Sequence, residues 1–277
     1  MIAVQQHDTA AWNNQRLGKF TASTIGKLLT GPRMTKELQA RADAGEVFFG
    51  DTALSVIADK AAERVSGIVE YQPSTFSMKR GTVLEHAAKY LLSRHWQKVN
   101  DCAFQPRGKN SGATPDGLLD SGATMDVKCP ESFTDVMRFG AEVADGDFDA
   151  LLRWNKVYAW QIMHQALCAG STEAWLVYFT DRLPWIKLTE EERDAVQCIL
   201  DEQCAEFNQE NLFPFEYAFG SPGFAYVARR FDLTQERSDL IDRTLAAAEV
   251  ACENVACSFR SVLAGLDKMT NDFTNAQ

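Results

Sequence analysis

The sequence predicts a mixed α/β fold, in which a small mixed sheet is flanked by helices and followed by a helical C-terminal extension. Two observations predict it. Apolar residues recur at helical spacing in both terminal parts of the chain, whereas residues 102–129 contain short apolar runs separated by Gly, Ser, Asn and Asp. With 277 residues, 45% of them hydrophobic, the chain has enough material for a substantial core.

The helices that precede the predicted strands are indicated by apolar stripes and capping residues. Residues 21–31 are expected to form a short helix, with Thr21 or Ser23 as its cap. Residues 52–66 and 81–96 each place apolar side chains on one face, as an amphipathic helix does. Three helices are therefore expected before the sheet.

The sheet and the elements after it are predicted from changes in sequence texture. Turn-forming residues at 109–112 and 120–122 separate predicted strands. The predicted strands lie near 102–106, 112–119, 123–129 and 173–180, and the predicted helices near 154–169, 189–210 and 234–265. We accordingly divide the chain into a core with an N-terminal helical segment, residues 1–186, and an acidic, mostly helical extension packed on it, residues 187–277.

Charge is distributed unevenly along the chain. The net charge is −10, and residues 187–277 hold 8 basic against 17 acidic side chains. Residues 1–41 hold six basic side chains against Asp8 and Glu37. A basic patch of this kind attracts a polyanion even when the remote surface is acidic, but on composition alone a solvated charged face is the favoured interpretation.

Cysteine usage and hydropathy predict the cellular setting. Seven cysteines without any Cys-x-x-Cys pair indicate thiols in a reducing compartment rather than disulfides or a zinc site. No apolar run approaches the roughly 20 residues that cross a bilayer. The N-terminus also lacks the basic and apolar regions of a secretory signal. We therefore expect a cytoplasmic protein without membrane association.

The chemistry is predicted to lie on two adjacent strands. Asp116 and Asp126 are ten residues apart across a tight turn, so their carboxylates are expected to meet. Because side chains alternate along a strand, Asp126 and Lys128 share one face. Carboxylates hold a hard divalent cation such as Mg²⁺, and the Val127 carbonyl is placed to add a ligand. A lysine beside them suits phosphodiester hydrolysis, because it orients water or stabilises charge.

The same three charged residues also fit a simpler interpretation, an exposed ion-pair ladder on the solvent face of a hairpin. Their neighbours are small or apolar, however, which indicates a poorly hydrated setting. Both interpretations stay open on spacing alone.

Four blocks of sequence carry a resemblance to a known family. Pro115-Asp116 followed by Asp126-Val-Lys128 is similar to the PD-(D/E)XK nuclease signature. The flanking blocks resemble its lambda-exonuclease branch, the YqaJ-type viral recombinases. The blocks are Arg16-Leu-Gly-Lys-Phe-Thr-Ala-Ser23, Arg80-Gly-Thr-Val-Leu-Glu85, Ala113-Thr-Pro-Asp-Gly-Leu118 with Asp126-Val-Lys-Cys-Pro130, and Tyr158-Ala-Trp-Gln-Ile-Met-His-Gln165. The resemblance spans about residues 12–180 and implies a restriction-endonuclease-like core.

The resemblance implies roles for residues of the predicted core. Glu85 matches the helical acidic residue near the metals, although a surface glutamate is the alternative. Gln161 matches a glutamine that reaches the scissile or terminal phosphate, although a core amide bonded to backbone is the alternative. The catalytic set is then Lys128, Asp116, Asp126, Glu85 and Gln161, with Asp116, Asp126, Glu85 and the Val127 carbonyl as metal ligands.

A second set of residues is implied to bind the DNA end. Arg16 and Ser23 match the block that binds a terminal 5′-phosphate, and Thr114 adds a hydroxyl. A plain helix-capping role for Ser23 is equally compatible. Arg33 and Met78 match a groove-reading arginine and a side chain that wedges the duplex end, and Met78 also fits ordinary core packing. One departure is Asp126, where relatives usually have Glu.

The implied activity is that of an alkaline exonuclease, a metal-dependent deoxyribonuclease using Mg²⁺, with Mn²⁺ as a substitute. It would act 5′-to-3′ on double-stranded DNA ends, release 5′-mononucleotides and leave a 3′ overhang for recombination and repair by strand annealing. Implied partners are 5′-phosphorylated DNA ends, two further copies in a homotrimer ring, and a single-strand annealing recombinase. The basic N-terminal segment is expected to face the channel of the ring, and the acidic C-terminal helices the periphery or a partner protein. Substitution of the C-terminal acids should then leave the exonuclease rate unchanged.

Two rival functions share parts of this pattern. An endonuclease or RecB-like accessory nuclease would keep the same core, and intact supercoiled circular DNA would argue against it. A non-catalytic DNA-end-binding scaffold of recombination would keep only the binding residues. The complete set of Asp116, Asp126, Lys128 and Glu85 argues against the scaffold.

Overall fold

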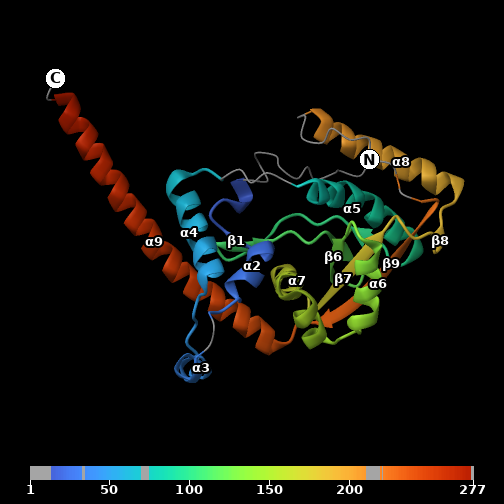
Figure 1. The fold of residues 1–277 in the computed structure, drawn as a ribbon, viewed down its shortest axis with the longest axis horizontal. Coiled ribbons are helices and arrows are strands. Elements are labelled where there is room, and N and C mark those ends of the chain that lie inside the picture. Colours follow the sequence, from blue (N-terminus) through green and yellow to red (C-terminus); the bar gives the residue numbers. More distant parts are fainter. Residues whose placement is uncertain (1–13, 33–34, 70–74, 210–218, 220, 276–277) are drawn as a thin grey trace. The chain divides into compact units, whose positions relative to one another are not determined.

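The computed structural model describes residues 14–32, 35–69, 75–209, 219 and 221–275 (Figure 1). The chain forms two compact units, each assembled from segments that are distant in sequence. Unit 1 comprises Met1–Tyr71, Phe104–Ala113 and Thr234–Gln277, and unit 2 comprises Gln72–Ala103 and Thr114–Leu233.

Unit 1 combines a small sheet with helices from both ends of the chain. The strand order is β1-β4-β3, with β1 parallel and β3 antiparallel to β4. The amphipathic helix α4 packs against the long helix α9, and α2 packs against α4. The elements are β1 (Phe20–Thr21), α2 (Ala22–Leu28), α3 (Lys36–Asp43), α4 (Asp51–Ser66), β3 (Gln105–Arg107), β4 (Ser111–Ala113) and α9 (Gln235–Asn275).

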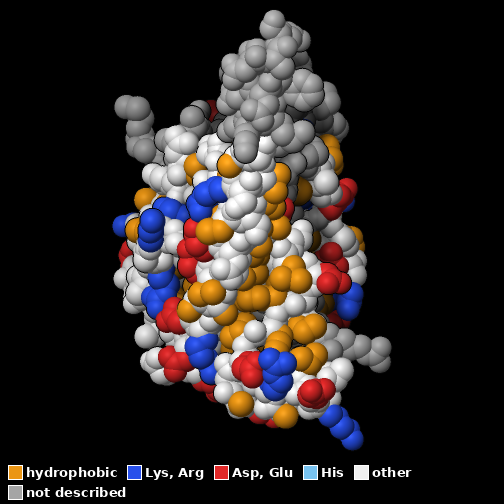
Figure 2. All heavy atoms as spheres, turned by 90° about the vertical axis from the view of Figure 1, so that its left-hand side faces the viewer, with side chains coloured by type: hydrophobic (Ala, Val, Ile, Leu, Met, Phe, Trp, Pro, Cys, Tyr) orange, Lys and Arg blue, Asp and Glu red, His pale blue; other side chains and the backbone are white. Residues whose placement is uncertain are grey.

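Some apolar side chains of α4 and α9 stay exposed. Leu54 on α4 is 49% exposed, and Val250 and Val262 on α9 are 64% and 62% exposed. Figure 2, viewed from the side on which α9 lies in Figure 1, shows hydrophobic side chains gathered in a band. The face of α9 that packs on α4 is instead buried, as at Ile241 and Cys252.

Unit 2 is built on a six-stranded mixed sheet with the order β2-β5-β6-β7-β9-β8. The β6–β7 pair is parallel and the other pairs are antiparallel. The elements are α5 (Phe76–His95), β2 (Val99–Asn100), β5 (Gly117–Leu119), β6 (Thr124–Lys128), α6 (Phe133–Glu142), α7 (Phe148–Ala169), β7 (Glu173–Thr180), β8 (Ile186–Lys187), α8 (Glu190–Gln209) and β9 (Gly223–Asp232).

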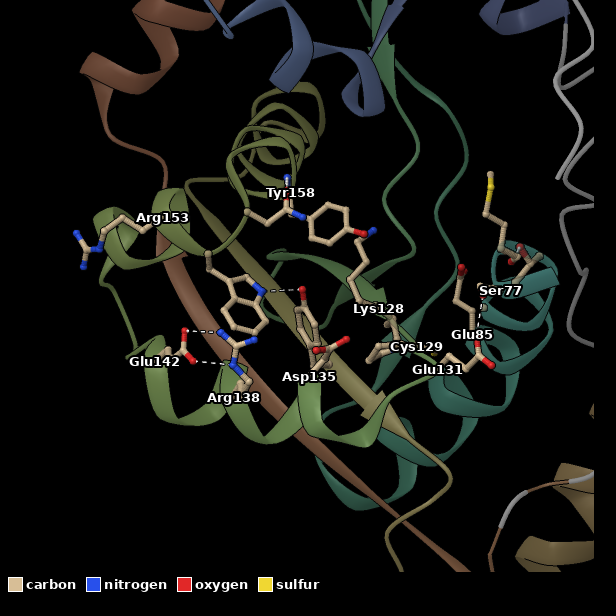
Figure 3. Close-up of a pocket in the computed structure, with 18 of the residues that line it drawn as sticks. Ser77, Glu85, Lys128, Cys129, Glu131, Asp135, Arg138, Glu142, Arg153 and Tyr158 are labelled. Carbon is tan, nitrogen blue, oxygen red and sulfur yellow. Dashed lines mark hydrogen bonds and ion pairs between the residues drawn. The ribbon is translucent and has the colours of Figure 1, made fainter. Parts of the chain in front are cut away.

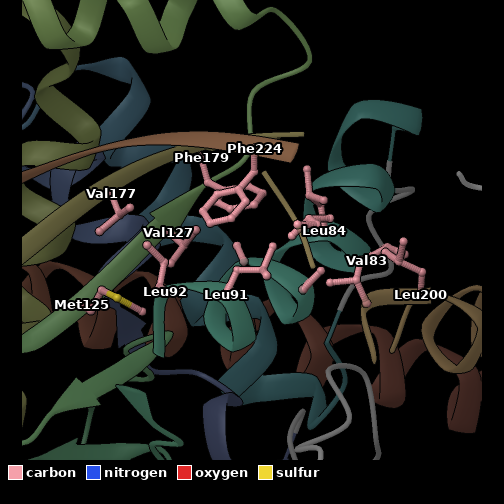
Figure 4. Packing of buried hydrophobic residues seen from close by; sticks show 14 of the residues in the cluster. Val83, Leu84, Leu91, Leu92, Met125, Val127, Val177, Phe179, Leu200 and Phe224 are labelled. Atoms are coloured by element: carbon pink, nitrogen blue, oxygen red, sulfur yellow. The ribbon is translucent and has the colours of Figure 1, made fainter. Parts of the chain in front are cut away.

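The core of unit 2 fixes which way β6 faces. Met125 and Val127 point into a cluster with Leu84 and Leu91 of α5 (Figure 4). Because side chains alternate along a strand, the residues between and beyond them, Asp126 and Lys128, point to the opposite face. The hydrophobic core thus determines where the charged residues of β6 lie.

The predicted fold class is confirmed, and most predicted helices and strands are present. One predicted strand, 112–119, is in fact two strands. β4 ends at Ala113 in the sheet of unit 1, and β5 begins at Gly117 in the sheet of unit 2. Pro115 lies between them, where it cannot donate a backbone hydrogen bond to a sheet.

Helices α3 and α6 and strand β9 were not predicted. In β9, Arg229 and Arg230 interrupt the apolar alternation. Arg229 donates through Nε to the carbonyl of Val143 (2.6 Å) and through Nη2 to that of Gly140 (2.8 Å), at the end of α6. Such distant acceptors are invisible in the sequence. The six-stranded sheet contains β7 from before residue 186 and β9 from after it. The domain boundary expected at residue 186 stays a prediction.

Two further sequence features have counterparts in the structure. All seven cysteines lie in the described residues as thiols that are not joined in disulfides. Within the same residues, no helix combines the length and apolarity needed to cross a membrane.

Candidate functional site

Asp126 is the centre of a buried polar cluster in unit 2. Its side chain is fully buried. Oδ1 accepts hydrogen bonds from Nε2 of Gln161 (2.8 Å) and of Gln165 (2.9 Å). Oδ2 lies 2.6 Å from Nζ of Lys128 in an ion pair that is not directed as a hydrogen bond. Burial of a carboxylate requires such compensation, so the cluster is built around this one group.

The two glutamines reach Asp126 because α7 is kinked. Asn155 has non-helical backbone angles, and its Oδ1 accepts the Tyr158 N–H (3.0 Å), which caps the second part of the helix. Tyr158, Gln161 and Gln165 then recur at helical spacing on one side. Lys128 Nζ lies 4.7 Å from the centre of the Tyr158 ring, in a cation–π contact.

Lys128 is held as a cation. Burial opposes its charged form, but Asp126 and Asp116 raise its pKa above the ordinary lysine value. The Lys128 side chain is 21% exposed and lines a cavity. Lys128 therefore presents a fixed positive charge to whatever enters.

Asp116 lies at the start of β5, where the break after β4 turns it toward β6. Its Oδ2 accepts the Val127 N–H at 2.7 Å, so a carboxylate replaces a strand carbonyl in this pairing. Burial raises its pKa well above the usual range, and the negative charges of Glu85 and Asp126 raise it further. Asp116 and Asp126 thus belong to one electrostatic cluster, as the hairpin predicted.

Glu85 approaches the cluster from α5. Burial raises its pKa to about 6, Lys89 opposes the shift and Asp126 adds to it. Its Oε1 atom is buried without a hydrogen-bond partner, and Nζ of Lys89 is 3.8 Å away. A carboxylate in that position is stabilised by a further cation. The alternative of an exposed surface glutamate does not describe this side chain, whose exposure is 16%.

A cavity of about 900 Å³ is lined by Glu85, Lys128 and Tyr158 of this cluster (Figure 3). One wall is α5 with Met78 and Glu85, the floor is the end of β6 with Val127 and Lys128, and the far wall is α6 and α7. In Figure 3, Lys128 and Tyr158 point toward one another from opposite elements. Met78 is 59% exposed at the rim, so it is not core packing.

The carboxylates of Glu85, Asp116 and Asp126 are the donors that a divalent cation would use here. Within the part of the chain that the structure describes, no three His, Cys, Asp or Glu side chains already form a group that could hold a metal. Glu85 Oε1 and Asp126 Oδ2 are nevertheless buried without hydrogen bonds, and Asp126 Oδ2 has the Lys128 ion pair alone. Hard oxygens of this kind, in a cluster where burial raises the pKa values of Glu85 and Asp116, match the preferences of Mg²⁺. The chemistry of the donor set therefore fits the cation.

The residues predicted to bind the DNA end are distributed over both units. Arg16 is half-buried and Ser23 is exposed in the first turn of α2, with its Oγ 3.1 Å from Thr21 Oγ1. Thr21, not Ser23, is the N-cap. In unit 2, the carbonyl of Thr114 is 3.5 Å from Gln165 Nε2, and its hydroxyl is buried without a partner. Arg33 lies outside the described residues.

Two functional residues were missed by the sequence analysis. Gln165 was quoted in the matching block without a role, although its place four residues after Gln161 is the signal that would have found it. Arg80 on α5 is buried and donates to Asp181 Oδ1 at 2.5 Å, which ties the helix bearing Glu85 to the end of β7. No local pattern indicates that partner, which is 101 residues away.

Replacement of Gln165 by Leu is expected to lower the free energy of unfolding by about 1.5–3 kcal/mol, the usual contribution of a hydrogen bond to a charged group. The matched control is Gln197→Leu, because Gln197 bonds Asp201 on the exposed face of α8 (2.7 Å). The control should stay within about 0.5 kcal/mol of wild type. Chemical denaturation measures both, and equal effects would show that Gln165 does not stabilise Asp126 specifically.

The fold is that of a known class of nucleases. The chain is similar to an alkaline exonuclease (LHK-Exo) from Laribacter hongkongensis, with 21% identity, a TM-score of 0.61, and 93% of this chain and 100% of that one covered. The same enzyme in complex with dAMP matches at 20% identity with the same TM-score. A phage related exonuclease from Haemophilus somnus 129PT matches at 16% identity and a TM-score of 0.56, over 89% of this chain and 99% of that one.

Sequence comparison then gives the family. The model of the YqaJ-like viral recombinase domain matches residues 11–172, more than half of the chain. The protein belongs to this family, which confirms the resemblance carried by the four sequence blocks. No curated protein sequence matches the chain.

Proposed function

We propose that the protein is a Mg²⁺-dependent 5′-to-3′ exonuclease acting on double-stranded DNA ends. The observation that carries the proposal is the ion pair between the buried Asp126 and Lys128, because Lys128 and Glu85 line one cavity and Asp116 belongs to the same electrostatic cluster. Family membership and the fold of alkaline exonucleases support it. The complex of a structural relative with dAMP supports a nucleotide-containing substrate.

Asp116, Asp126, Glu85 and the Val127 carbonyl would hold the cation. When bound, Mg²⁺ or Mn²⁺ supplies water activation and charge stabilisation at the phosphate. Lys128 orients the attacking water and stabilises the charge that develops on the phosphate oxygens. Gln161 and Gln165 hold Asp126 Oδ1, which leaves Oδ2 directed toward Lys128. The second N–H of Gln161 Nε2 is the donor that would contact the phosphate.

Arg16, Ser23 and Thr114 are proposed to contact the terminal 5′-phosphate, with Arg33 and Met78 contacting the duplex. An arginine fork and hydroxyl groups suit a phosphate dianion. The products would be 5′-mononucleotides and a 3′ overhang for an annealing recombinase, and the active assembly a homotrimer. The exposure of Met78 at the cavity rim supports a contact with the duplex end.

The test compares linear duplexes with 5′-phosphate and 5′-hydroxyl ends and supercoiled circles, with Mg²⁺ and with a chelator. We expect nucleotides to be released from linear DNA only with Mg²⁺, faster from 5′-phosphorylated ends, and circles to stay intact. Cleavage of circles would identify an endonuclease instead. DNA-end binding without any cleavage would identify a scaffold, and preferential loss of the 3′-ended strand would reverse the polarity.

A further inference from the structure

The loop formed by residues 16–20 of unit 1 is held by hydrogen bonds to other segments on both sides of Lys19. The Gly18 N–H donates to Glu63 Oε2 (2.7 Å), and the Gly18 carbonyl accepts from Nε of Arg64 (2.8 Å). Beyond Lys19, the Phe20 N–H donates to the Asn110 carbonyl (2.9 Å). Two successive residues of α4 and the turn before β4 thus hold the loop that carries Arg16.

Glu249 of α9 joins these two supports. Its carboxylate accepts both ends of the Arg64 guanidinium (2.7 and 2.8 Å), and Oε1 also accepts from Nδ2 of Asn110 (2.6 Å). Bidentate pairs of this kind fix orientation as well as distance. The Arg64 side chain is 13% exposed and that of Glu249 is 35% exposed, so the pair is partly shielded from water. A ring of bonds therefore runs from Gly18 through Arg64, Glu249 and Asn110 to Phe20.

Gly18 is part of the same construction. Its φ is +66°, and a Cβ atom there would lie 2.5 Å from Cγ of Arg64. A flexible arginine could usually move aside, but this one is held at its far end by Glu249 and at Nε by Gly18 itself. Glu63, which accepts the Gly18 N–H, is itself held by an ion pair between its Oε1 and Nζ of Lys60 (2.6 Å). The loop conformation and the position of Arg64 are thus specified together.

We propose that Glu249 is a positioning residue for recognition of a 5′-phosphorylated DNA end. Through Arg64 and Asn110, it holds the loop whose residue Arg16 is to meet the phosphate. The inference rests on the proposed function, which supplies that role of Arg16. The Lys19 N–H donates to the Arg16 carbonyl (3.0 Å), so Arg16 belongs to the same bonded turn. The C-terminal helix then contributes to substrate recognition, and Glu249 departs from the expectation that C-terminal acids are dispensable.

The experiment compares Glu249→Ala with Glu253→Ala in the full-length protein. Glu253 is the matched control, because it lies one turn further along α9 and, among the described residues, its side-chain hydrogen bonds stay within that helix, with Arg260 (2.8 Å) and Cys257 (3.8 Å). Two properties are measured: hydrogen–deuterium exchange of the Gly18 and Phe20 amides, and KM and kcat on 5′-phosphate and 5′-hydroxyl duplexes. Arg64→Lys, which keeps the charge but not the fork, provides a second variant should Glu249→Ala unfold.

For Glu249→Ala and Arg64→Lys we expect faster exchange of the Gly18 and Phe20 amides. KM on the 5′-phosphate duplex should rise on the order of tenfold, the effect of losing one charge-assisted hydrogen bond, whereas kcat should stay nearly unchanged. Glu253→Ala should match wild type. Unchanged exchange would overturn the clamp, and faster exchange with intact preference for 5′-phosphate would show a purely structural role. A wild-type enzyme indifferent to the 5′ group would instead remove the proposed phosphate pocket, and with it the recognition role of Glu249, whatever the exchange shows.

Discussion

Replacement of Asp126 by Asn is expected to lower the rate of DNA cleavage by on the order of 10³-fold, the scale of removing one charge-stabilising group. Asn keeps the oxygen that accepts from Gln161 and Gln165, so the fold should persist. What is lost is the charge that pairs with Lys128 and would bind the cation. Nucleotide release from linear duplex DNA measures the rate, and calorimetric titration measures Mg²⁺ affinity.

The control for this change is Asp120→Asn on the same hairpin. The side chain of Asp120 is 65% exposed in the turn between β5 and β6. Its replacement should leave rate and metal affinity at wild-type values. An Asp126→Asn enzyme that retained wild-type cleavage would exclude this cluster as the catalytic centre.

The Lys128→Met variant should lose both activity and stability. Cleavage should fall by roughly 10²–10³-fold, because the fixed charge beside the phosphate is lost. The free energy of unfolding should fall by about 3 kcal/mol or more without metal, because the fully buried Asp126 carboxyl loses its cationic partner. Added Mg²⁺ should restore much of the stability but none of the activity, as thermal unfolding and cleavage assays would show.

Lys98→Met provides the comparison for Lys128→Met. Nζ of Lys98 lies 4.0 Å from Asp120, and its side chain is 68% exposed. An exposed pair of this kind contributes at most about 1 kcal/mol. A loss of stability in Lys128→Met no greater than in Lys98→Met, or a Mg²⁺ rescue of activity, would contradict the role given to Lys128.

The centre of the candidate site could be predicted from the sequence because its residues lie close together in the chain. Asp126 and Lys128 are two residues apart on one strand, so alternation alone puts them on one face. The apolar neighbours Met125 and Val127 then indicate that the opposite face is buried. The apolar stripe of residues 81–96 placed Glu85 on a helix. Only the family resemblance, however, predicted that this helix lies beside the strand of Asp126.

The rest depends on contacts between distant segments. Gln161 could be expected near phosphate, whereas the structure places its amide on Asp126, 35 residues earlier. The bond between Arg64 and Glu249 spans 185 residues and leaves no periodic signal. Strand β9 was missed for the same reason, since Arg229 donates to the carbonyls of Gly140 and Val143 and Arg230 pairs with Glu173 (3.6 Å).

The pair of glutamines on α7 has a consequence for how this site varies among relatives. Where most relatives are expected to have Glu, this chain has the shorter Asp126, and two amides four residues apart close on its Oδ1. A glutamate there would push one more methylene into a fully buried space already filled by those amides. The space that Gln161 and Gln165 leave around Asp126 therefore suits the shorter of the two acidic side chains.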